Sequence, residues 1–219
     1  MTVKAILVAG GYGSRLHPFT HYTQKTLLPL YNRPVIDYAL GTIRRAGIKD
    51  ITIISNRFVD QIASHVGQGL PGERIHYVIE EEPLGVAHAL NLARPYNENA
   101  RLMVYFSDNI TTVEFGQHVA EFSAADTSPG CLLIARKETH LEAFGVAVMD
   151  EEGTICDIVE KPANPPSNLA IGGIYLFDER FWKFLDTATA QQGDAFSISD
   201  RSEEHTSELQ SLTNLVCRL

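Results

Sequence analysis

The residues best suited to chemistry lie within the first 25 positions. An apolar run, Val3–Ala9, leads into a stretch with three closely spaced glycines, Gly10, Gly11 and Gly13. Because glycine has no side chain, the backbone N–H groups of such a loop can approach an anion closely. Arg15 follows the glycines, and Lys25 comes ten residues after the arginine. Two cations beside exposed N–H groups predict a site that binds a triphosphate.

The spacing of the glycines excludes two common phosphate-binding motifs. The GxGxxG pattern fails because Leu16 stands where its last glycine would be, and the Walker A pattern fails because no Gly-Lys-Ser/Thr follows. An NAD-dependent oxidoreductase is therefore nearly excluded. An ordinary strand-to-helix turn would explain the glycines alone. Arg15 and Lys25 argue against it, because burying two charges in a turn costs much free energy.

A second candidate is Asp108, which follows the apolar run Leu102–Phe106 within the sequence Ser107-Asp108-Asn109. In open α/β sheets, ligands bind beyond the carboxyl ends of the parallel strands. A carboxylate is a hard oxygen ligand, suited to a largely hydrated Mg²⁺ held on phosphates. The simpler alternative is an Asx turn or a helix cap after a strand.

The composition is that of a globular protein large enough for one domain. Of the 219 residues, 44% are hydrophobic and 21% are charged. The formal net charge of −9 argues against a nucleic-acid partner. No apolar run approaches the roughly 18 residues of a membrane span, and no signal peptide is visible. The three cysteines show no metal-binding spacing. We therefore expect a cytoplasmic protein with no membrane partner.

Strands alternate with helices up to residue 125, which predicts parallel strands with helical crossovers. The predicted strands are Val3–Ala9, Ile51–Ser55, Ile75–Ile79 and Leu102–Phe106. The predicted helices are Pro34–Ala46, Val59–Val66, Leu84–Leu92 and Glu114–Ala125. Beyond residue 130 strands dominate, over Cys131–Arg136, Gly145–Met149, Ile155–Glu160 and Gly172–Phe177, with one helix at Arg180–Thr187. A turn at Asp150–Gly153 predicts an antiparallel hairpin, so we expect one domain with a mixed sheet.

Residues 201–219 depart from this pattern. Arg201–Ser211 matches the in-frame translation of a common sequencing-library adapter. We therefore expect a domain over residues 1–200, incomplete at its C-terminus, followed by a non-native tail, and at most weak enzyme activity from this chain. The alternative is a natural amphipathic helix with Leu209, Leu212 and Leu215 on one face.

The stretches LVAGGYGSRLHPFT and KTLLPLYNRPVIDY resemble the N-terminal signature of the sugar-1-phosphate nucleotidylyltransferases, and the similarity runs from about Val3 to Asp200. The resemblance implies an α/β fold with a Rossmann-like mixed, mostly parallel sheet and helices on both faces, the nucleotide-diphospho-sugar transferase fold. It implies transfer of a nucleoside monophosphate from a nucleoside triphosphate to a sugar 1-phosphate, with Mg²⁺ and release of pyrophosphate. The similarity is greatest to members that use dTTP and glucose 1-phosphate, with UTP as the second choice. A homo-oligomer is expected for the full-length protein.

The resemblance also implies roles for individual residues. The implied catalytic residues are Arg15, Lys25, Asp108 and Lys161, of which Asp108 would hold Mg²⁺. The implied nucleotide-binding residues are Ala9, Gly10, Gly11, Gly13, Ser14, Glu80 and Gly85. The implied residues for the sugar phosphate are Gly145, Glu160, Lys161 and Gly172, the last in a sugar-facing turn at Ile171–Gly173.

Several positions depart from the family pattern. Glu80 replaces a usual glutamine, Ser107 replaces a glycine, and Gly173 stands where threonine is common. Gln192-Gly193-Asp194 replaces an Arg-Gly-Glu, and a second Mg²⁺-binding aspartate has no counterpart. A carboxyl group can donate a hydrogen bond to a pyrimidine carbonyl only when it is protonated. With Glu80 at this position, the sequence does not determine which base the protein prefers. These departures would also suit the alternative function, a non-catalytic nucleotide-binding or regulatory homologue.

Overall fold

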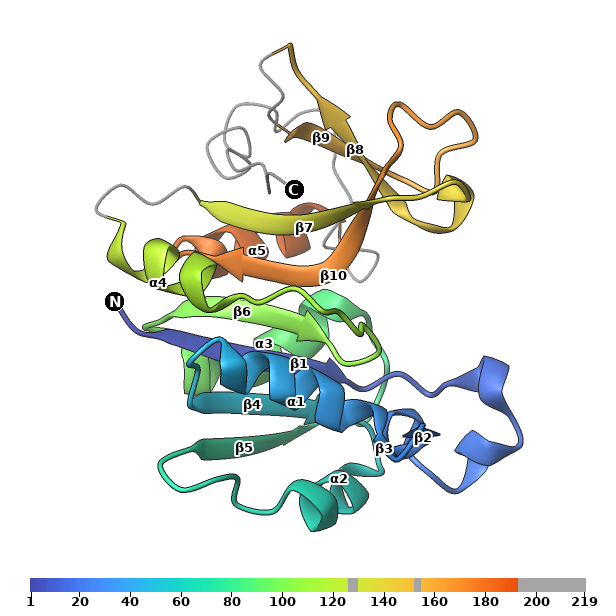
Figure 1. The fold of residues 1–219 in the computed structure, drawn as a ribbon, viewed down its shortest axis with the longest axis vertical. Helices are drawn as coiled ribbons and strands as arrows, with labels where there is room; N and C mark the ends of the chain where they lie inside the picture. The colour runs from blue at the N-terminus through green and yellow to red at the C-terminus, as the bar shows by residue number, and fades with distance from the viewer. Residues whose placement is uncertain (126–129, 152–154, 193–219) are drawn as a thin grey trace.

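The computed structural model describes residues 1–125, 130–151 and 155–192 of the protein (Figure 1). The predicted tail over residues 201–219 lies outside these ranges, as do Gly193, Asp194 and the end of the turn predicted at Asp150–Gly153.

One half of the central sheet is parallel, as predicted. Its four strands lie in the order β5-β4-β1-β6, which places the first strand of the chain in the middle. Their bounds are β1, Val3–Ala9; β4, Asp50–Ser55; β5, Arg74–Ile79; and β6, Arg101–Phe106. Because β1 lies between β4 and β6, the loops that follow these three strands meet at one edge of the sheet.

The other half of the sheet is antiparallel. The long strand β10 (Leu169–Phe177) pairs with β6 and carries the sheet from one half into the other. It also pairs with β7 (Cys131–Lys137) and β8 (Gly145–Met149). β9 (Ile155–Glu160) runs antiparallel to β8, which confirms the predicted hairpin.

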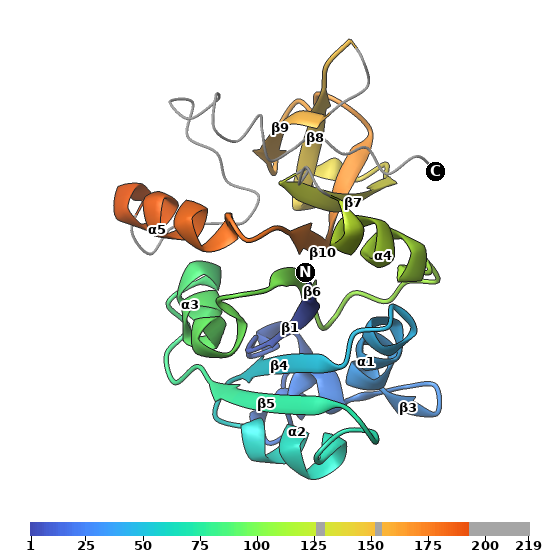
Figure 2. The same ribbon diagram turned by 90° about the vertical axis from the view of Figure 1, so that its left-hand side faces the viewer.

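Helices cover both faces of the sheet, which confirms the predicted architecture (Figure 2). On one face, α3 (Val86–Asn97) and α5 (Phe181–Gln192) pack against a core that contains Ile6, Leu90 and Trp182. On the other face, α1 (Val35–Arg45), α2 (Val59–Val66) and α4 (Gly116–Ala124) pack against Leu7 and its neighbours. Alternate residues of β1 thus enter different cores, as strand geometry requires.

Three local features differ from the predictions. Helix α3 continues five residues beyond Leu92, because Nδ2 of Asn97 donates to Thr52 Oγ1 of β4 (2.9 Å) and anchors the extra turns. A short hairpin, β2 (Pro29–Leu30) with β3 (Arg33–Pro34), precedes α1. Lys25 begins a 3₁₀ turn, Lys25–Leu27, that was not predicted from the sequence.

Candidate active site

The glycine loop and Lys25 come together, as the sequence predicts. Gly13 has a left-handed backbone (φ 63°), and a Cβ built on it would lie 2.9 Å from Cβ of Lys25. A Cβ on Gly11 would lie 3.2 Å from Nζ of the same lysine. Side chains at these positions would therefore displace the lysine, so the glycines are needed for Lys25 to pack beneath the loop.

Lys25 forms an ion pair with Asp108, which follows β6. Its Nζ lies 2.7 Å from Asp108 Oδ2, and the side chains are 21% and 57% exposed. Asn109 holds this turn in place: its Nδ2 donates to the Phe106 carbonyl (3.1 Å), and its Oδ1 accepts from the Gly173 N–H (3.3 Å). A Cβ on Gly173 would collide with the Asn109 amide, which explains the glycine at this departure from the family pattern.

The carbonyl groups of Ala9, Gly10 and Gly13 accept hydrogen bonds from the protein, whereas among the described residues the N–H groups of the loop donate none. Ala9 O accepts from Gln24 Nε2, and Gly10 O accepts from Asn56 Nδ2 (3.0 Å). Gly13 O accepts from the Leu16 N–H and from Thr20 Oγ1, both at 2.8 Å. In the part of the chain that the structure describes, the N–H groups of residues 10–14 donate to no protein atom. These N–H groups are therefore able to bind an anion.

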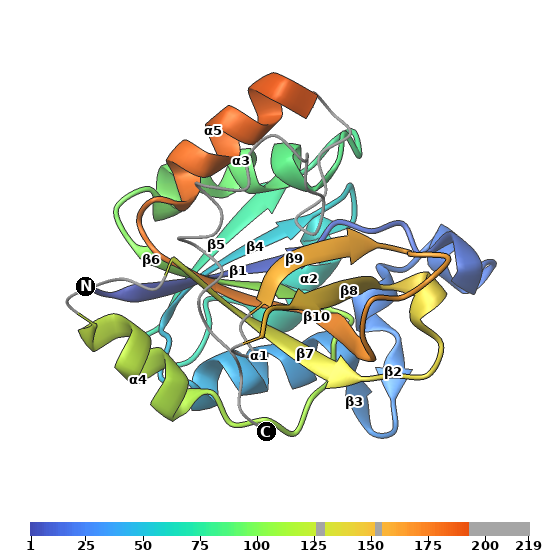
Figure 3. The ribbon, with the colours of Figure 1, turned by 90° about the horizontal axis from the view of Figure 1, so that it is seen from above.

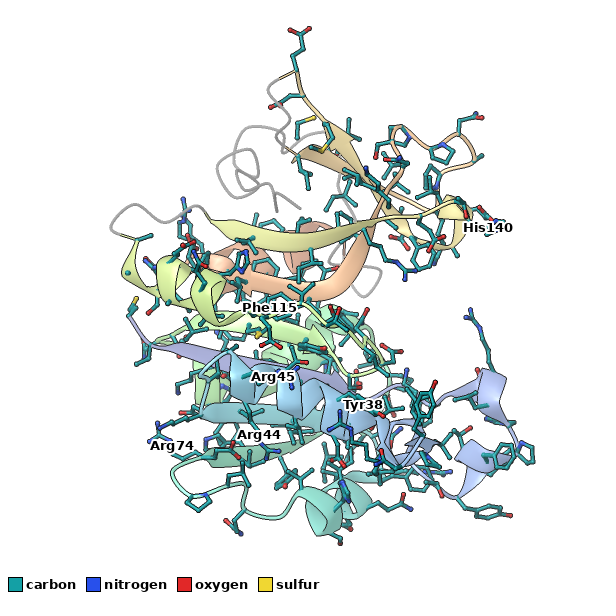
Figure 4. The ribbon with its side chains drawn as sticks, in the orientation of Figure 1. Tyr38, Arg44, Arg45, Arg74, Phe115 and His140 are labelled. Atoms are coloured by element: carbon teal, nitrogen blue, oxygen red, sulfur yellow. The ribbon has the colours of Figure 1, made fainter. Side chains whose placement is uncertain are left out.

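Arg15 and Ser14 lie on the exposed 3₁₀ turn Ser14–Leu16 that follows the loop. Among the described residues, Arg15 forms no ion pair. Three other arginines of this half are already paired, Arg44 with Glu73 (2.8 Å), Arg45 with Glu114 (3.0 Å) and Arg74 with Asp50 (2.8 Å). Figure 4 shows them away from the glycine loop, at the other end of α1 and β5, so they are not candidates for binding at the loop.

Glu80 is buried beside the loop, at the carboxyl end of β5. Its side chain lies directly against Gly10, where a Cβ would collide with Oε2, and only 7% of the residue is exposed. Burial raises the pKa of Glu80, and the nearby charge of His88 partly opposes this by lowering it. Gly85 directly precedes α3 and has φ 104°, a conformation that favours glycine. Both residues thus lie just beyond β5, in the stretch to which the family resemblance assigns nucleotide binding.

The raised pKa of Glu80 leads to a prediction about stability and pH. A folded state with a raised carboxyl pKa binds a proton more tightly than the unfolded chain, so its stability falls as pH rises through that pKa. Replacing Glu80 with glutamine removes this effect. We compare the unfolding free energies of Glu80→Gln and the wild type by urea unfolding at a series of pH values. The variant should become more stable relative to the wild type as pH rises from about 4, and the difference should then level off.

The matched control for this experiment is Glu81→Gln, because Glu81 is the exposed neighbour of Glu80. It should change stability little across the same pH range. A difference for Glu80→Gln that stays constant between pH 4 and pH 8 would contradict the burial argument.

The predicted residues for the sugar phosphate form a second group at the end of β9. Gly145 and Glu160 are partners across β8 and β9, and the Lys161 N–H donates to the Phe144 carbonyl (2.9 Å). Nζ of Lys161 lies 3.3 Å from Glu160 Oε1, and the lysine side chain is 63% exposed. The structure thus brings Gly145, Glu160 and Lys161 together, with the lysine able to reach a ligand.

Gly172 lies inside β10, so the prediction of a turn at Ile171–Gly173 is wrong. The pairing of β10 with β7 shifts register between Ile171 and Tyr175. A Cβ on Gly172 would lie 3.3 Å from the Ile134 carbonyl of β7, so the glycine allows close approach of that strand.

The two groups lie toward the same edge of the molecule. Figures 1 and 3 both show the loop that follows β1 and the loop that follows β9 extending from one edge of the sheet.

Across the described residues, no three His, Cys, Asp or Glu side chains gather into a set that could hold a metal ion. Asp108 thus lies at this edge of the sheet without two further carboxylate, imidazole or thiol groups around it among the described residues. None of the described helices combines the length and apolar character needed to cross a bilayer.

Ser107, where the family pattern has glycine, carries a buried hydroxyl. The residue is 1% exposed, and its Oγ has no hydrogen-bond partner among the described residues. A buried unpaired polar group destabilises a protein. We expect Ser107→Ala to raise the unfolding free energy by about 1 kcal/mol, measured by chemical unfolding. Ser167→Ala is the control and should destabilise, because the Ser167 hydroxyl donates to the Ala147 carbonyl (2.5 Å). A loss of stability in Ser107→Ala would contradict the argument.

Known proteins are similar to this chain in sequence and in fold. The chain is 35% identical over 199 residues to a glucose-1-phosphate thymidylyltransferase of Streptomyces griseus, covering 90% of this chain and 56% of that protein. It is 32% identical over 205 residues to the enzyme of that name from Neisseria gonorrhoeae, covering 90% of this chain and 69% of the relative. A Bacillus anthracis protein described as a candidate glucose-1-phosphate thymidylyltransferase, solved with sucrose, superposes with a TM-score of 0.83 at 32% identity. That alignment covers 91% of this chain and 80% of the solved one.

The match to a protein family extends over nearly the whole sequence. The chain spans little more than half the length of the Streptomyces relative, 56%. The family model for nucleotidyl transferases matches residues 4–216, which include the glycine loop, Lys25, Asp108 and the Glu160–Lys161 pair. With the fold and these matches together, the chain belongs to the nucleotidyl transferase family.

Proposed function

We propose that the protein transfers a nucleoside monophosphate from a nucleoside triphosphate to a sugar 1-phosphate, giving a nucleotide-sugar and pyrophosphate. The observation that carries the proposal is the position of Lys25. Its ammonium lies beneath a loop whose N–H groups are unpaired among the described residues, and it is paired to Asp108 at 2.7 Å. Such a cluster can neutralise and orient a polyphosphate.

The residues support a direct displacement at the α-phosphorus. An oxygen of the sugar phosphate forms a bond to the α-phosphorus, the bond from that phosphorus to the bridging oxygen breaks, and pyrophosphate leaves with the electron pair. Lys25, Arg15 and the loop N–H groups would hold the triphosphate, while Lys161 would hold the phosphate of the attacking sugar. Catalysis then consists of positioning and charge neutralisation, and no covalent enzyme intermediate is needed.

The residues at the loop also fit a Mg²⁺ ion, which would neutralise charge on the phosphates. Asp108 offers a hard oxygen ligand whose side chain is 57% exposed. Its Oδ2 pairs with Lys25, and its Oδ1 accepts only a long hydrogen bond from Asn109 Nδ2 (3.5 Å). One carboxylate suits Mg²⁺, because this ion keeps several waters and takes its remaining ligands from phosphates. Lys25 would then pair with Asp108 before the triphosphate binds and with a phosphate group afterwards.

We propose dTTP and glucose 1-phosphate as the favoured substrates, with UTP as the second nucleotide. The names of the relatives support this choice. Glu80 bears on the base, because its carboxyl group can both accept and donate only when protonated, and burial favours that form. We also propose, from the family resemblance, a homo-oligomeric full-length protein that acts in the cytoplasm.

A screen of pyrophosphate release tests the proposal. This chain and the longest form of the protein that its gene encodes are each mixed with glucose 1-phosphate, Mg²⁺ and one of dTTP, UTP, CTP, GTP or ATP. We expect release that requires both substrates and is fastest with dTTP. Absence of release and of triphosphate binding would overturn the proposal, and binding without release would favour a non-catalytic nucleotide-binding homologue.

A further inference from the structure

We propose that Gln24 and Asn56 are positioning residues whose side-chain amides turn the glycine loop so that its N–H groups face the triphosphate. The inference rests on the function proposed above and adds two residues to it. Both side chains are buried, with 1% and 2% of the residues exposed, and both donate to carbonyl groups of the loop. Neither belongs to the glycine motif.

The orientation of both amides is fixed by their other contacts. Oε1 of Gln24 accepts from the N–H and the hydroxyl of Thr26, both at 2.5 Å, and a backbone N–H can only donate. Nε2 must therefore be the atom that faces Ala9 O. In the same way, Oδ1 of Asn56 accepts from the Phe58 N–H (3.0 Å), which leaves Nδ2 facing Gly10 O.

Fixing a carbonyl also fixes the N–H of the next residue. The only cis peptide bond among the described residues is His17–Pro18, so the peptide groups of the loop are trans. In a trans peptide, the C=O and the following N–H point in opposite directions. Holding the carbonyls of Ala9 and Gly10 against buried amides therefore points the N–H groups of Gly10 and Gly11 away from the protein interior.

Gln24 also connects the loop to the catalytic lysine. It precedes Lys25 and caps the 3₁₀ turn Lys25–Leu27, through the same Oε1 that accepts from Thr26. Its own N–H donates to Oε1 of Gln61 on α2 (3.0 Å), which ties the segment to the helix. One buried amide thus sets the direction of the loop N–H groups and the start of the turn that carries Lys25.

The test compares neutral variants of nearly the same size. Gln24→Met and Asn56→Leu remove the donor without adding charge. Asn97→Leu is the matched control, because Asn97 is also 1% exposed and donates to a carbonyl, that of Ala93 (2.7 Å), but on α3. Each purified chain is examined for cooperative thermal unfolding and for its dissociation constant with dTTP by calorimetry.

We expect all three variants to unfold at lower temperature, but only two of them to lose the nucleotide. Gln24→Met and Asn56→Leu should bind dTTP about 10- to 100-fold more weakly, because misplaced donors lose most of their effect. Asn97→Leu should bind within about twofold of the wild type, as expected for a purely structural amide. Asn56→Ala, which also removes the donor, provides the same comparison if Asn56→Leu does not fold.

Two results would overturn the inference, and they differ in what else they affect. Wild-type affinity in the folded Gln24 and Asn56 variants would show that the amides are only structural, and the proposed function would stand. A wild-type chain that binds no triphosphate would overturn both the inference and the proposed function.

Discussion

Replacing Lys25 with methionine is expected to slow pyrophosphate release by about 10²–10³-fold while the fold remains intact. Methionine keeps an unbranched apolar stem that can pack beneath Gly11 and Gly13, but it removes the ammonium. The lysine pairs with Asp108 at a partly exposed position, so the lost ion pair should cost no more than about 1 kcal/mol of stability. Activity and stability should therefore separate.

Lys49→Met is the control for Lys25→Met, because Lys49 is an exposed lysine at the start of β4, at the opposite edge of the sheet. It should retain wild-type turnover. The measurement is the rate of pyrophosphate release together with the urea midpoint of each variant. Near-normal turnover in Lys25→Met would remove the lysine from the proposed catalytic residues.

Replacing Asp108 with asparagine should lower turnover by roughly 10²-fold or more and raise the Mg²⁺ concentration needed for half-maximal rate. Asparagine has nearly the same shape, but its side chain carries no charge and is a weaker ligand for a hard cation. Asp108 is the one carboxylate that the described residues place against Lys25. Loss of its charge should therefore weaken the binding of Mg²⁺ and also remove the partner of the Lys25 ammonium.

Glu114→Gln is the matched control for Asp108→Asn, because Glu114 also forms an exposed ion pair, with Arg45 at 3.0 Å. Both variants should lose little stability, since exposed pairs contribute about 0–1 kcal/mol. Only Asp108→Asn should change the dependence of the rate on Mg²⁺. An unchanged Mg²⁺ dependence in that variant would remove Asp108 from the proposed metal site.

Much of the fold could be predicted because the apolar pattern and the structure agree locally. The predicted strands Val3–Ala9 and Gly145–Met149 match β1 and β8 residue for residue, and helix Val59–Val66 matches α2. The two strands are nearly continuous apolar runs, the helix has apolar residues at helical spacing, and a glycine or a polar residue follows each segment. The pairing of Lys25 with Asp108 was also foreseeable, because loops after neighbouring parallel strands meet at one edge.

The remaining features depend on contacts between distant segments. Nothing local indicates that β10 enters the sheet between β6 and β8, or that Gly172 allows approach of β7. Asn56 was missed because a single asparagine after a strand is common in turns. Its position was a usable signal, because Asn56 follows β4 at the same edge of the sheet as the glycine loop. Its hydrogen bond to the Gly10 carbonyl, however, can be recognised only in the folded structure.

The most direct test of the central claim is a crystal structure of the chain with Mg²⁺ and a non-hydrolysable analogue of dTTP. The account predicts phosphate oxygens within about 3 Å of N–H groups of residues 10–14 and of Lys25 Nζ. It also predicts that the carbonyls of Ala9 and Gly10 remain on Gln24 and Asn56. Phosphates bound elsewhere, with Arg15 and Lys25 turned away from them, would contradict it.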